Sequence, residues 1–265
     1  MCTTCGCGTG HHGATFHGHA HGHHHDGRHD HDHAHAHGPR GDGTPPNGRR
    51  RTVLLERDLL AKNDRIAAEN RRALAAAGVS MFNIIGGPGA GKTALLEATI
   101  GRLRRELMLA VLEGDQATDR DAQRIQRAGC RVLQINTDSG CHLDAAMIAE
   151  GLRIIAPRPS SVVFVENVGN LVCPALFDIG ERAKIVVMSV TEGEDKPLKY
   201  AHVWSASELF VLTKIDLLPH VSFDEDRCVR WAREVNPEIE VLRVSALRGD
   251  GMDQWCNWIR RQLAT

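Results

Sequence analysis

Residues 81–93 read MFNIIGGPGAGKT, a short apolar run followed by a glycine-rich turn that ends in Lys92 and Thr93. The spacing fits G-x-x-x-x-G-K-T between a strand and an apolar helix, where backbone N–H groups and a helix N-terminus surround phosphate. This setting argues against the simpler alternative, a glycine-rich turn with an incidental lysine. Lys92 would reach the terminal phosphates and the Thr93 hydroxyl would bind magnesium. We expect the nucleotide to contact Gly86, Gly87, Pro88, Gly89, Ala90, Gly91, Lys92, Thr93 and Ala94.

Short β-branched runs alternate with helical patterns from Met81 to the end of the chain. Such a pattern predicts an α/β fold: a mostly parallel, doubly wound sheet with helices on both faces and ligands beyond the carboxyl ends of the strands. The expected strands are Met81–Ile85, Ala110–Glu113, Val132–Asn136, Val162–Glu166, Ile185–Val190, Leu209–Thr213 and Val241–Val244. The expected helices are Lys92–Leu107, Asp119–Ala128, Leu143–Ile155, Asp224–Val235 and Met252–Gln262.

Composition divides the chain of 265 residues into three parts. Residues 1–50 contain no Val, Ile or Leu, so we expect a disordered tail there. Residues 51–78 are predicted to form an amphipathic helix that packs on the following domain, and residues 79–265 to form the P-loop domain. Overall, 42% of positions are apolar and 25% are charged, which is enough to build a core.

The formal net charge of -1 gives no reason to expect a nucleic-acid or anionic-membrane partner. No run approaches the roughly 18 apolar residues that a membrane span needs. The N-terminus carries Cys, Gly and His where a secretory signal would be apolar, so a cytoplasmic protein is expected.

A second motif, Thr213-Lys214-Ile215-Asp216, follows a predicted strand and indicates which base is bound. The Asp216 carboxylate can accept two hydrogen bonds from guanine, whereas adenine would face it with an acceptor. The backbone N–H groups of residues 245–247 could donate to guanine O6. The guanine-binding residues are therefore expected to be Thr213, Lys214, Asp216, Ser245, Ala246 and Leu247.

Acidic residues follow two other predicted strands. Glu166 can hold magnesium through water, and Gly169 can offer its N–H to the γ-phosphate. The acidic loop 113–115 is a second candidate, whereas Asp119 or Asp121 is more simply a helix cap. Magnesium is expected at Thr93, Asp115 and Glu166, and these residues with Lys92 form the expected catalytic set.

Three cysteines, Cys2, Cys5 and Cys7, form the N-terminal cysteine motif, C-x-x-C-x-C. Three thiolates this close can bind one ion, and a backbone or terminal nitrogen would complete a square-planar nickel site. Zinc would need a fourth ligand, which nearby histidines could supply. A flexible redox-active tail is the alternative.

Cys141, His142 and Cys173 form a second constellation, the Cys-His-Cys cluster. His142 leads into a predicted helix, and Cys173 follows the loop that begins at Glu166. Each residue alone would more often be buried in a core. Together they supply three metal ligands, and a two-fold dimer would bring six together. The remaining cysteines, expected to be core or surface thiols, are Cys130, Cys228 and Cys256.

Thirteen of the 16 histidines lie in residues 11–37, the histidine tract. A mobile chain can bring two to four imidazoles to one nickel, copper or zinc ion, so several weak sites are expected. An expression tag is the alternative, but it would not be expected between a cysteine motif and a linker. The members are His11, His12, His17, His19, His21, His23, His24, His25, His29, His31, His33, His35 and His37.

The motifs CTTCGC, GGPGAGKT, CHLD, ENVGNLVCP and TKID occur in one order, with the histidine tract after the first. With them the chain resembles the HypB family, the nickel-incorporation GTPases of [NiFe]-hydrogenase maturation. The resemblance implies a dimerising (SIMIBI-class) GTPase in which GTP favours the dimer. It implies that hydrolysis is coupled to nickel release toward the hydrogenase large-subunit precursor, with a HypA-type metallochaperone as partner. The related nickel-delivery GTPases that serve urease share the GTPase core, but a different metal motif would be expected in them.

The resemblance also assigns sites. It implies that the N-terminal cysteine motif binds nickel tightly, that the Cys-His-Cys cluster binds nickel or zinc near the dimer interface, and that Asp115 is a magnesium-linked switch aspartate. The histidine tract would store nickel. Thr213 stands where the common guanine motif has Asn, which should weaken bracing of the loop, and Leu247 stands where Lys is frequent. The stretch 191–197 also resembles a family segment.

Two other functions fit parts of the sequence. A metal-sequestering protein would use the nucleotide domain only to oligomerise, and its metal binding would be indifferent to nucleotide. A P-loop kinase or ATPase would share the phosphate loop, but Asp216 argues against it. We expect slow intrinsic turnover, because no glutamine or arginine finger can be assigned.

Overall fold

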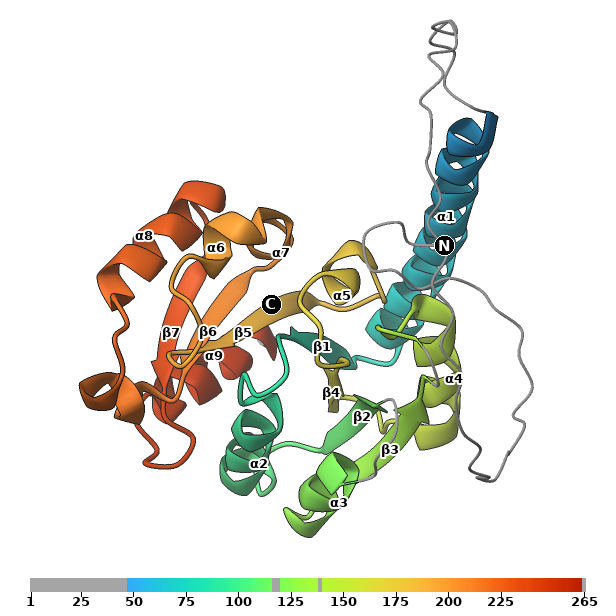
Figure 1. Ribbon diagram of the computed structural model, residues 1–265. Helices are drawn as coiled ribbons and strands as arrows, with labels where there is room; N and C mark the ends of the chain where they lie inside the picture. Colours follow the sequence, from blue (N-terminus) through green and yellow to red (C-terminus); the bar gives the residue numbers. More distant parts are fainter. Residues whose placement is uncertain (1–46, 116–119, 138–139, 264–265) are drawn as a thin grey trace, which may run out of the picture. The chain divides into compact units, whose positions relative to one another are not determined.

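The computed structural model describes residues 47–115, 120–137 and 140–263 (Figure 1). Side chains are described from Asp58 onward. The chain divides into two compact units, Met1–Glu56 and Arg57–Thr265. The N-terminal cysteine motif, the histidine tract and Asp119 lie outside the described residues, so the expectations for them stay predictions. The fold below is that of the second unit.

Seven parallel strands form one sheet in the order β3-β2-β4-β1-β5-β6-β7. From β1 the chain passes to β2 and then to β3 at one edge, and returns to β4, which lies between β2 and β1. Strands β5, β6 and β7 then follow in order on the other side of β1. The carboxyl ends of β1, β2 and β4 therefore meet near the point where the order changes direction, which is where doubly wound sheets bind ligands. The strands are β1 (Ser80–Ile85), β2 (Leu109–Asp115), β3 (Arg131–Asn136), β4 (Val162–Glu166), β5 (Ala183–Ser189), β6 (Leu209–Thr213) and β7 (Glu240–Val244).

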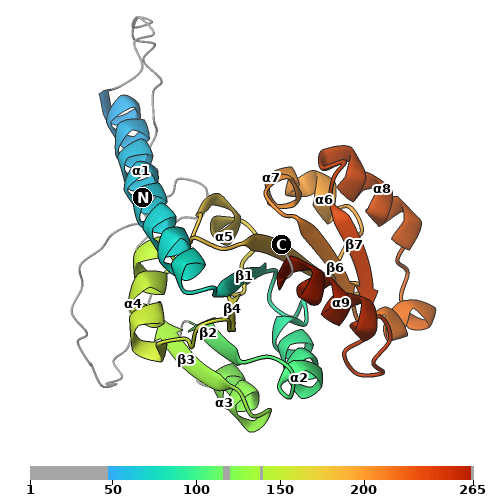
Figure 2. The same ribbon diagram turned by 180° about the vertical axis from the view of Figure 1, so that it is seen from behind.

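Helices cover both faces of the sheet (Figures 1 and 2). One face carries α2 (Lys92–Leu103), α3 (Arg120–Arg127) and α9 (Met252–Leu263). The other face carries the end of α1 (Asn47–Ala76), through Leu74, and α4 (Ala145–Ile155), α5 (Cys173–Leu176), α6 (Lys196–Lys199), α7 (Ala201–Ser205) and α8 (Glu225–Val235). A 3-10 helix, η1 (Ile215–His220), follows β6. The predicted doubly wound α/β fold is confirmed.

Alternation along β1 explains how the two faces are filled. Phe82 and Ile84 pack into the core beneath α2 and α9, whereas Met81 and Ile85 pack toward the helices on the opposite face. Both sets are almost completely buried, as expected for a central parallel strand covered on two sides. Asn83 lies among them and is also fully buried.

The helical segments differ from the sequence prediction in three ways. The helix preceding β1 begins at Asn47 rather than at residue 51, because the intervening arginines favour a helix. Residues 104–107, predicted as helix, form turns after Leu103. The short helices α5, α6 and α7 were not predicted, because one turn shows no helical periodicity. In the described part of the chain, no helix combines the length and apolar character that crossing a membrane requires.

Candidate functional site

The phosphate loop, residues 86–93, joins the end of β1 to α2. Gly91 precedes the first residue of α2 with φ 94°, a conformation that favours glycine, and a Cβ at Gly86 would clash with the carbonyl oxygen of Val187. The Lys92 ammonium folds back over the loop, donating to Gly86 O at 3.2 Å and Gly87 O at 3.3 Å. Burial lowers the pKa of Lys92, and the charge of Glu166 opposes that shift. The loop thus encloses a buried amine.

Two buried carboxylates lie side by side at the carboxyl ends of β2 and β4. Glu113 and Glu166 are partners in the parallel pairing of these strands, and Thr93 Oγ1 donates to Glu166 Oε1 at 2.7 Å. Burial, helped by the charge of Glu166, raises the pKa of Glu113 to about 8, and burial raises that of Glu166 to about 7. Within the described residues, neither Glu113 Oε2 nor Glu166 Oε2 has a hydrogen-bond partner, although both atoms are buried.

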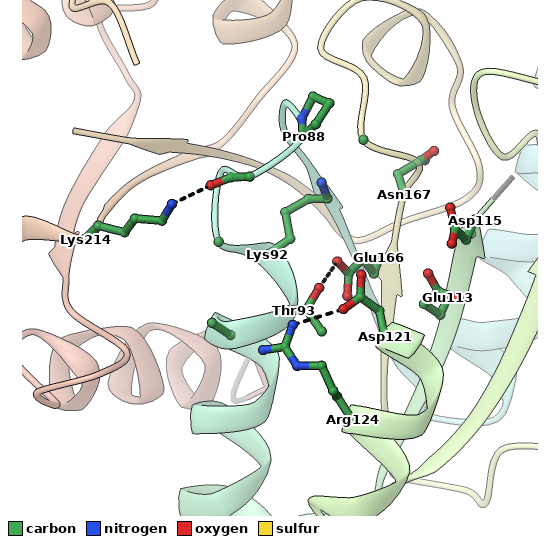
Figure 3. Close-up of a pocket in the computed structure, with 15 residues that line it drawn as sticks. Pro88, Lys92, Thr93, Glu113, Asp115, Asp121, Arg124, Glu166, Asn167 and Lys214 are labelled. Carbon is green, nitrogen blue, oxygen red and sulfur yellow. Dashed lines mark hydrogen bonds and ion pairs between the residues drawn. The ribbon is translucent and has the colours of Figure 1, made fainter. Parts of the chain in front are cut away.

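These carboxylates fit a magnesium ion. A hard cation such as magnesium prefers oxygen ligands. Bound here, it would give the unpartnered carboxylate oxygens a partner and offset the cost of burying their charge. Asp115 lies two residues beyond Glu113 in β2, so the segment predicted as an acidic loop is the end of a strand. Its side chain lines the same cavity as Glu113 and Glu166 (Figure 3). The residues that would hold magnesium are Thr93, Glu113, Asp115 and Glu166.

The cavity beside the phosphate loop has a volume of about 350 Å³. Arg124 and Asp121, from α3, also line it, and Arg124 Nη1 lies 3.0 Å from Asp121 Oδ1. Asp121 therefore lies inside the first turn of α3 in an ion pair, not ahead of the helix as a cap. Arg124 also bonds the Glu97 carboxylate at 2.5 and 3.1 Å. The predicted nucleotide-binding residues on the cavity wall are Pro88, Gly89, Gly91, Lys92, Thr93, Ala94, Gly169 and Lys214.

The sequence prediction did not include Arg124 in the site. It stands three residues after Asp121, so the two side chains share one face of α3. This spacing was the available signal, but only the packing of α3 against α2 brings that face to the phosphate loop. Figure 3 shows both side chains near Thr93 and Glu166.

The residues predicted to select guanine meet at the carboxyl ends of β6 and β7. Ser245 Oγ donates to Asp216 Oδ1 at 2.5 Å, which fixes the carboxylate. Thr213 Oγ1 donates to Ala90 O at 2.5 Å and Lys214 Nζ donates to Gly89 O at 2.8 Å, so both residues brace the phosphate loop. Whether Asn in place of Thr213 would brace the loop more strongly stays a prediction.

Of the residues predicted to bind guanine, Asp216, Ser245, Ala246 and Leu247 do not line the cavity beside the phosphate loop. Ser245 is buried, Ala246 is half-buried, and the Leu247 side chain is 87% exposed. The role predicted for Leu247 involves only its backbone N–H group, so exposure of its side chain does not affect that role. Asp216 is half-buried, within reach of a base that enters from solvent.

The Cys-His-Cys cluster assembles as predicted. One ligand atom from each of Cys141, His142 and Cys173 lies within 4.8 Å of the others. His142 Nδ1 is 3.7 Å from Cys141 Sγ, and its ring stacks on Phe177 with centroids 3.9 Å apart. Burial lowers the pKa of His142, which favours the neutral imidazole that binds metal. Two sulfurs and one imidazole suit nickel or zinc.

The segments that carry the cluster differ slightly from the sequence prediction. The helix after His142 begins at Ala145, because Asp144 caps it by accepting from Met147 N at 2.8 Å. Cys141 and His142 therefore lie in the loop ahead of the helix, and Cys173 is the first residue of α5. The three cysteines outside the cluster and the N-terminal motif, all buried, are Cys130, Cys228 and Cys256.

The cluster and the phosphate loop are connected by one segment. Asn170 pairs with Gly86 in an antiparallel bridge, and Asn170 Nδ2 donates to Cys141 O at 3.3 Å. Residues 166–173 thus run from a magnesium-site carboxylate past the phosphate loop to a thiol of the cluster. The segment therefore contacts both sites.

Comparison with known proteins places this arrangement among nucleotide-binding domains. Residues 80–243 match the family described as "CobW/HypB/UreG, nucleotide-binding domain". The hydrogenase maturation factor HypB of Azotobacter vinelandii is 51% identical over 228 residues, covering 86% of this chain and 75% of the relative. The corresponding Escherichia coli K12 protein is 50% identical over 225 residues, with 85% and 78% covered.

Solved structures give the same result. HypB from Archaeoglobus fulgidus superimposes with a TM-score of 0.72 at 36% identity, covering 77% of this chain and all of that one. HypB from Helicobacter pylori, solved in complex with nickel, gives 0.73 at 31% identity, with 77% and 95% covered.

Proposed function

The chain belongs to the HypB family of P-loop nucleotide-binding proteins, and from that premise we propose that it is a GTPase that controls nickel binding during [NiFe]-hydrogenase maturation. The observation that carries the proposal is the segment 166–173. It contributes Glu166 to the cavity and Cys173 to the Cys-His-Cys cluster, and Asn170 ties it to both. The relatives of the chain are named hydrogenase maturation factors, and the structure of one of them was solved in complex with nickel.

Hydrolysis requires that the terminal phosphate be held and its charge neutralised. The Lys92 ammonium and the backbone N–H groups of the phosphate loop bind the phosphates, and the Thr93 hydroxyl faces the cavity beside Glu166. Magnesium, when bound, neutralises charge on the phosphate oxygens. Asp115 lines the cavity from β2, in the place expected of a residue that senses the phosphate through the magnesium site.

Guanine selection rests on Asp216. Its carboxylate accepts from Ser245 through one oxygen and is half-buried, so it can also accept from the N1 and N2 hydrogens of guanine. Adenine presents an acceptor at the corresponding position, and a carboxylate that faces an acceptor loses its hydrogen bonds. The alternative of an ATP-dependent kinase is disfavoured on the same argument.

Nickel is the cargo in this proposal. The Cys-His-Cys cluster supplies three ligands, one fewer than a square-planar or tetrahedral ion needs. A homodimer favoured by GTP would pair two clusters and complete their coordination. The acceptor would be the [NiFe]-hydrogenase large-subunit precursor, with a HypA-type metallochaperone as partner. The N-terminal cysteine motif would hold nickel tightly, and the histidine tract would store further ions.

The test is a titration of the full chain with nickel and zinc in the GDP state and with a non-hydrolysable GTP analogue. Replacing Cys2, Cys5 and Cys7 by Ala isolates the Cys-His-Cys cluster. We expect its nickel affinity and the dimer fraction to depend on the nucleotide. Equal affinity and equal assembly in both states would contradict the proposal and favour simple metal sequestration.

The storage role of the tail needs a separate titration. Deleting residues 11–37 should lower the bound nickel by several equivalents and leave one tight site. If the tight site disappears with that deletion, its assignment to the N-terminal cysteine motif is wrong.

A further inference from the structure

Asn83 is an amide at the centre of an apolar strand. It lies between Phe82 and Ile84 in β1, and its side chain is completely buried on the face opposite to theirs. Asn83 Nδ2 donates to Glu181 Oε1, and Asn83 Oδ1 accepts from Asn167 Nδ2, both at 3.2 Å. A buried amide is stable in a core only when such partners are present, so Asn83 fixes both neighbours.

Asn167 is the end of this network nearest to the nucleotide. It follows Glu166 directly and lines the cavity beside the phosphate loop (Figure 3). Its Oδ1 atom accepts from Val168 N and from Leu143 N, both at 3.0 Å. Leu143 is the residue after His142, so one buried side chain joins the wall of the nucleotide cavity to the segment that carries two metal ligands.

Glu181 is the other end of the network. Glu181 Oε2 accepts from Ile179 N at 2.8 Å, and Lys184 Nζ lies 3.6 Å from its Oε1 atom. Lys184 in turn donates to Ala175 O at 2.9 Å and to Phe177 O at 3.3 Å. These contacts hold the segment that starts at Cys173 and includes the ring that stacks on His142.

The hydrogen bonds are interdependent. If Asn167 shifts when the cavity is filled, Asn83 Oδ1 loses its donor and Leu143 N loses its acceptor inside the core. Both groups must then follow Asn167 or remain unpaired, and a buried unpaired group is unfavourable. Movement at the cavity is therefore passed to both segments that carry the cluster.

We propose that Asn83, Asn167 and Glu181 form a polar relay that makes the metal affinity of the Cys-His-Cys cluster depend on the bound nucleotide. The proposal deepens the proposed function and rests on it. Asn83 and Glu181 are positioning residues, because they touch neither the cavity nor the metal ligands. They act through Asn167 on one side and through Ile179 and Lys184 on the other.

Helix α1 offers a matched control that separates coupling from simple support. Asn63 Oδ1 accepts from Ala145 N at 2.9 Å, and Asn63 Nδ2 donates to Asp178 O at 2.7 Å. Asn63 is 6% exposed and, like the relay, bonds both segments that carry the cluster. Within the described residues Asn63 forms no hydrogen bond with Asn83, Asn167 or Glu181, so its loss should weaken the cluster equally in every nucleotide state.

The test uses full-length protein with Cys2, Cys5 and Cys7 replaced, titrated with nickel while the thiolate-to-nickel absorption is recorded. The quantity compared is the ratio of nickel dissociation constants in GDP and in a non-hydrolysable GTP analogue. Coupled sites commonly show ratios of about 5 to 150. We expect Glu181→Gln to bring the ratio within about twofold of one, because Asn83 and Ile179 donate to different oxygens of Glu181 and Gln replaces one of these oxygens with an NH₂ donor.

Asn83→Leu should have the same effect, since leucine is close to asparagine in shape but forms no hydrogen bonds. If the Asn83→Leu protein does not fold, the Glu181→Gln protein alone tests the relay. Asn63→Ala should change both dissociation constants by the same factor and keep the ratio. A parental ratio far from one that persists in Glu181→Gln would overturn the relay while sparing the proposed function. A parental ratio of one would overturn both.

Discussion

The nucleotide site and the Cys-His-Cys cluster are built in opposite ways. Most of the residues that we propose bind phosphate lie in one continuous loop, residues 86–93, and would do so through its backbone. The cluster takes its ligands from two segments, at 141–142 and 173, that depend on a buried polar network for their spacing. The loop is one segment that Thr213 and Lys214 brace, whereas a site made of two segments can change when either segment moves. The second design suits the metal release that we propose.

Lys92→Ala should have the largest effect and should be confined to the first site. Loss of the buried ammonium is expected to reduce GTP hydrolysis by about 10²- to 10³-fold, a typical cost of removing one charge-stabilising group. Nickel binding by the Cys-His-Cys cluster in the nucleotide-free protein should be unchanged. Lys199→Ala, which removes an exposed lysine paired with Asp195, is the control. Steady-state phosphate release and a nickel titration measure both quantities, and loss of nickel binding would show that the sites are not separable.

Asp216→Asn should change base choice with a smaller loss. Replacing a carboxylate that receives hydrogen bonds is expected to weaken GTP binding by roughly 10- to 150-fold and ATP binding far less. Asp226→Asn, at an exposed position in α8, is the control. Equilibrium binding of both nucleotides gives the ratio of affinities. An Asp216→Asn protein that still prefers GTP to the original extent would contradict the guanine assignment.

Magnesium affinity should rise with pH. The pKa values of Glu166 and Glu113, about 7 and about 8, lie above the ordinary 4.5, so both groups tend to be protonated near and below pH 7. Magnesium must displace those protons, and its affinity should increase by at most about tenfold per pH unit for each proton displaced. Titrations between pH 6 and pH 8.5 measure the slope. Glu113→Gln should flatten its upper part, and a flat profile in the parent protein would contradict the magnesium assignment.

The same carboxyl groups affect folding when magnesium is absent. Because their folded pKa values are raised, the folded state holds these protons more tightly than the unfolded state. Their contribution to the free energy of unfolding is complete below about pH 4.5 and is lost as the pH rises through 7 and 8. Denaturant titrations with and without magnesium should therefore diverge as the pH increases.

Phe177→Leu should give the smallest effect and should be confined to the cluster. Removing the ring that stacks on His142 is expected to weaken nickel binding by about two- to tenfold, the usual value of an aromatic pair. GTP affinity should not change. Phe223→Leu removes a partly buried ring from another part of the core and serves as the control. Equal effects of both substitutions would show that stacking does not orient the imidazole.

Much of this arrangement could be predicted from local patterns. The seven strands were visible because each is a short apolar run, and Lys92, Asp216 and Cys173 belong to motifs whose order along the chain is informative. A parallel sheet places all the strand ends together, so the predicted sites had to share one edge. That is why two motifs separated by about 30 residues could be expected to form one metal cluster.

Other features depend on pairing between strands and on packing between helices. Glu113 was seen only as part of an acidic loop, because nothing local shows that it is buried beside Glu166. Arg124 reaches the cavity because α3 packs against α2, and the sequence of α3 alone does not show that packing. The role of Asn83 could not be predicted, because its partners lie 84 and 98 residues away in the sequence.

The central claim, that hydrolysis changes the metal site, is tested most directly by a single turnover. Protein with Cys2, Cys5 and Cys7 replaced is loaded with nickel and GTP, and magnesium is added in the presence of a chelator. Phosphate release and the thiolate-to-nickel absorption are recorded together. We expect nickel to leave the Cys-His-Cys cluster with the rate constant of phosphate release, and to stay bound when a non-hydrolysable analogue replaces GTP. Nickel loss at one rate with GTP, GDP and the analogue would contradict the account.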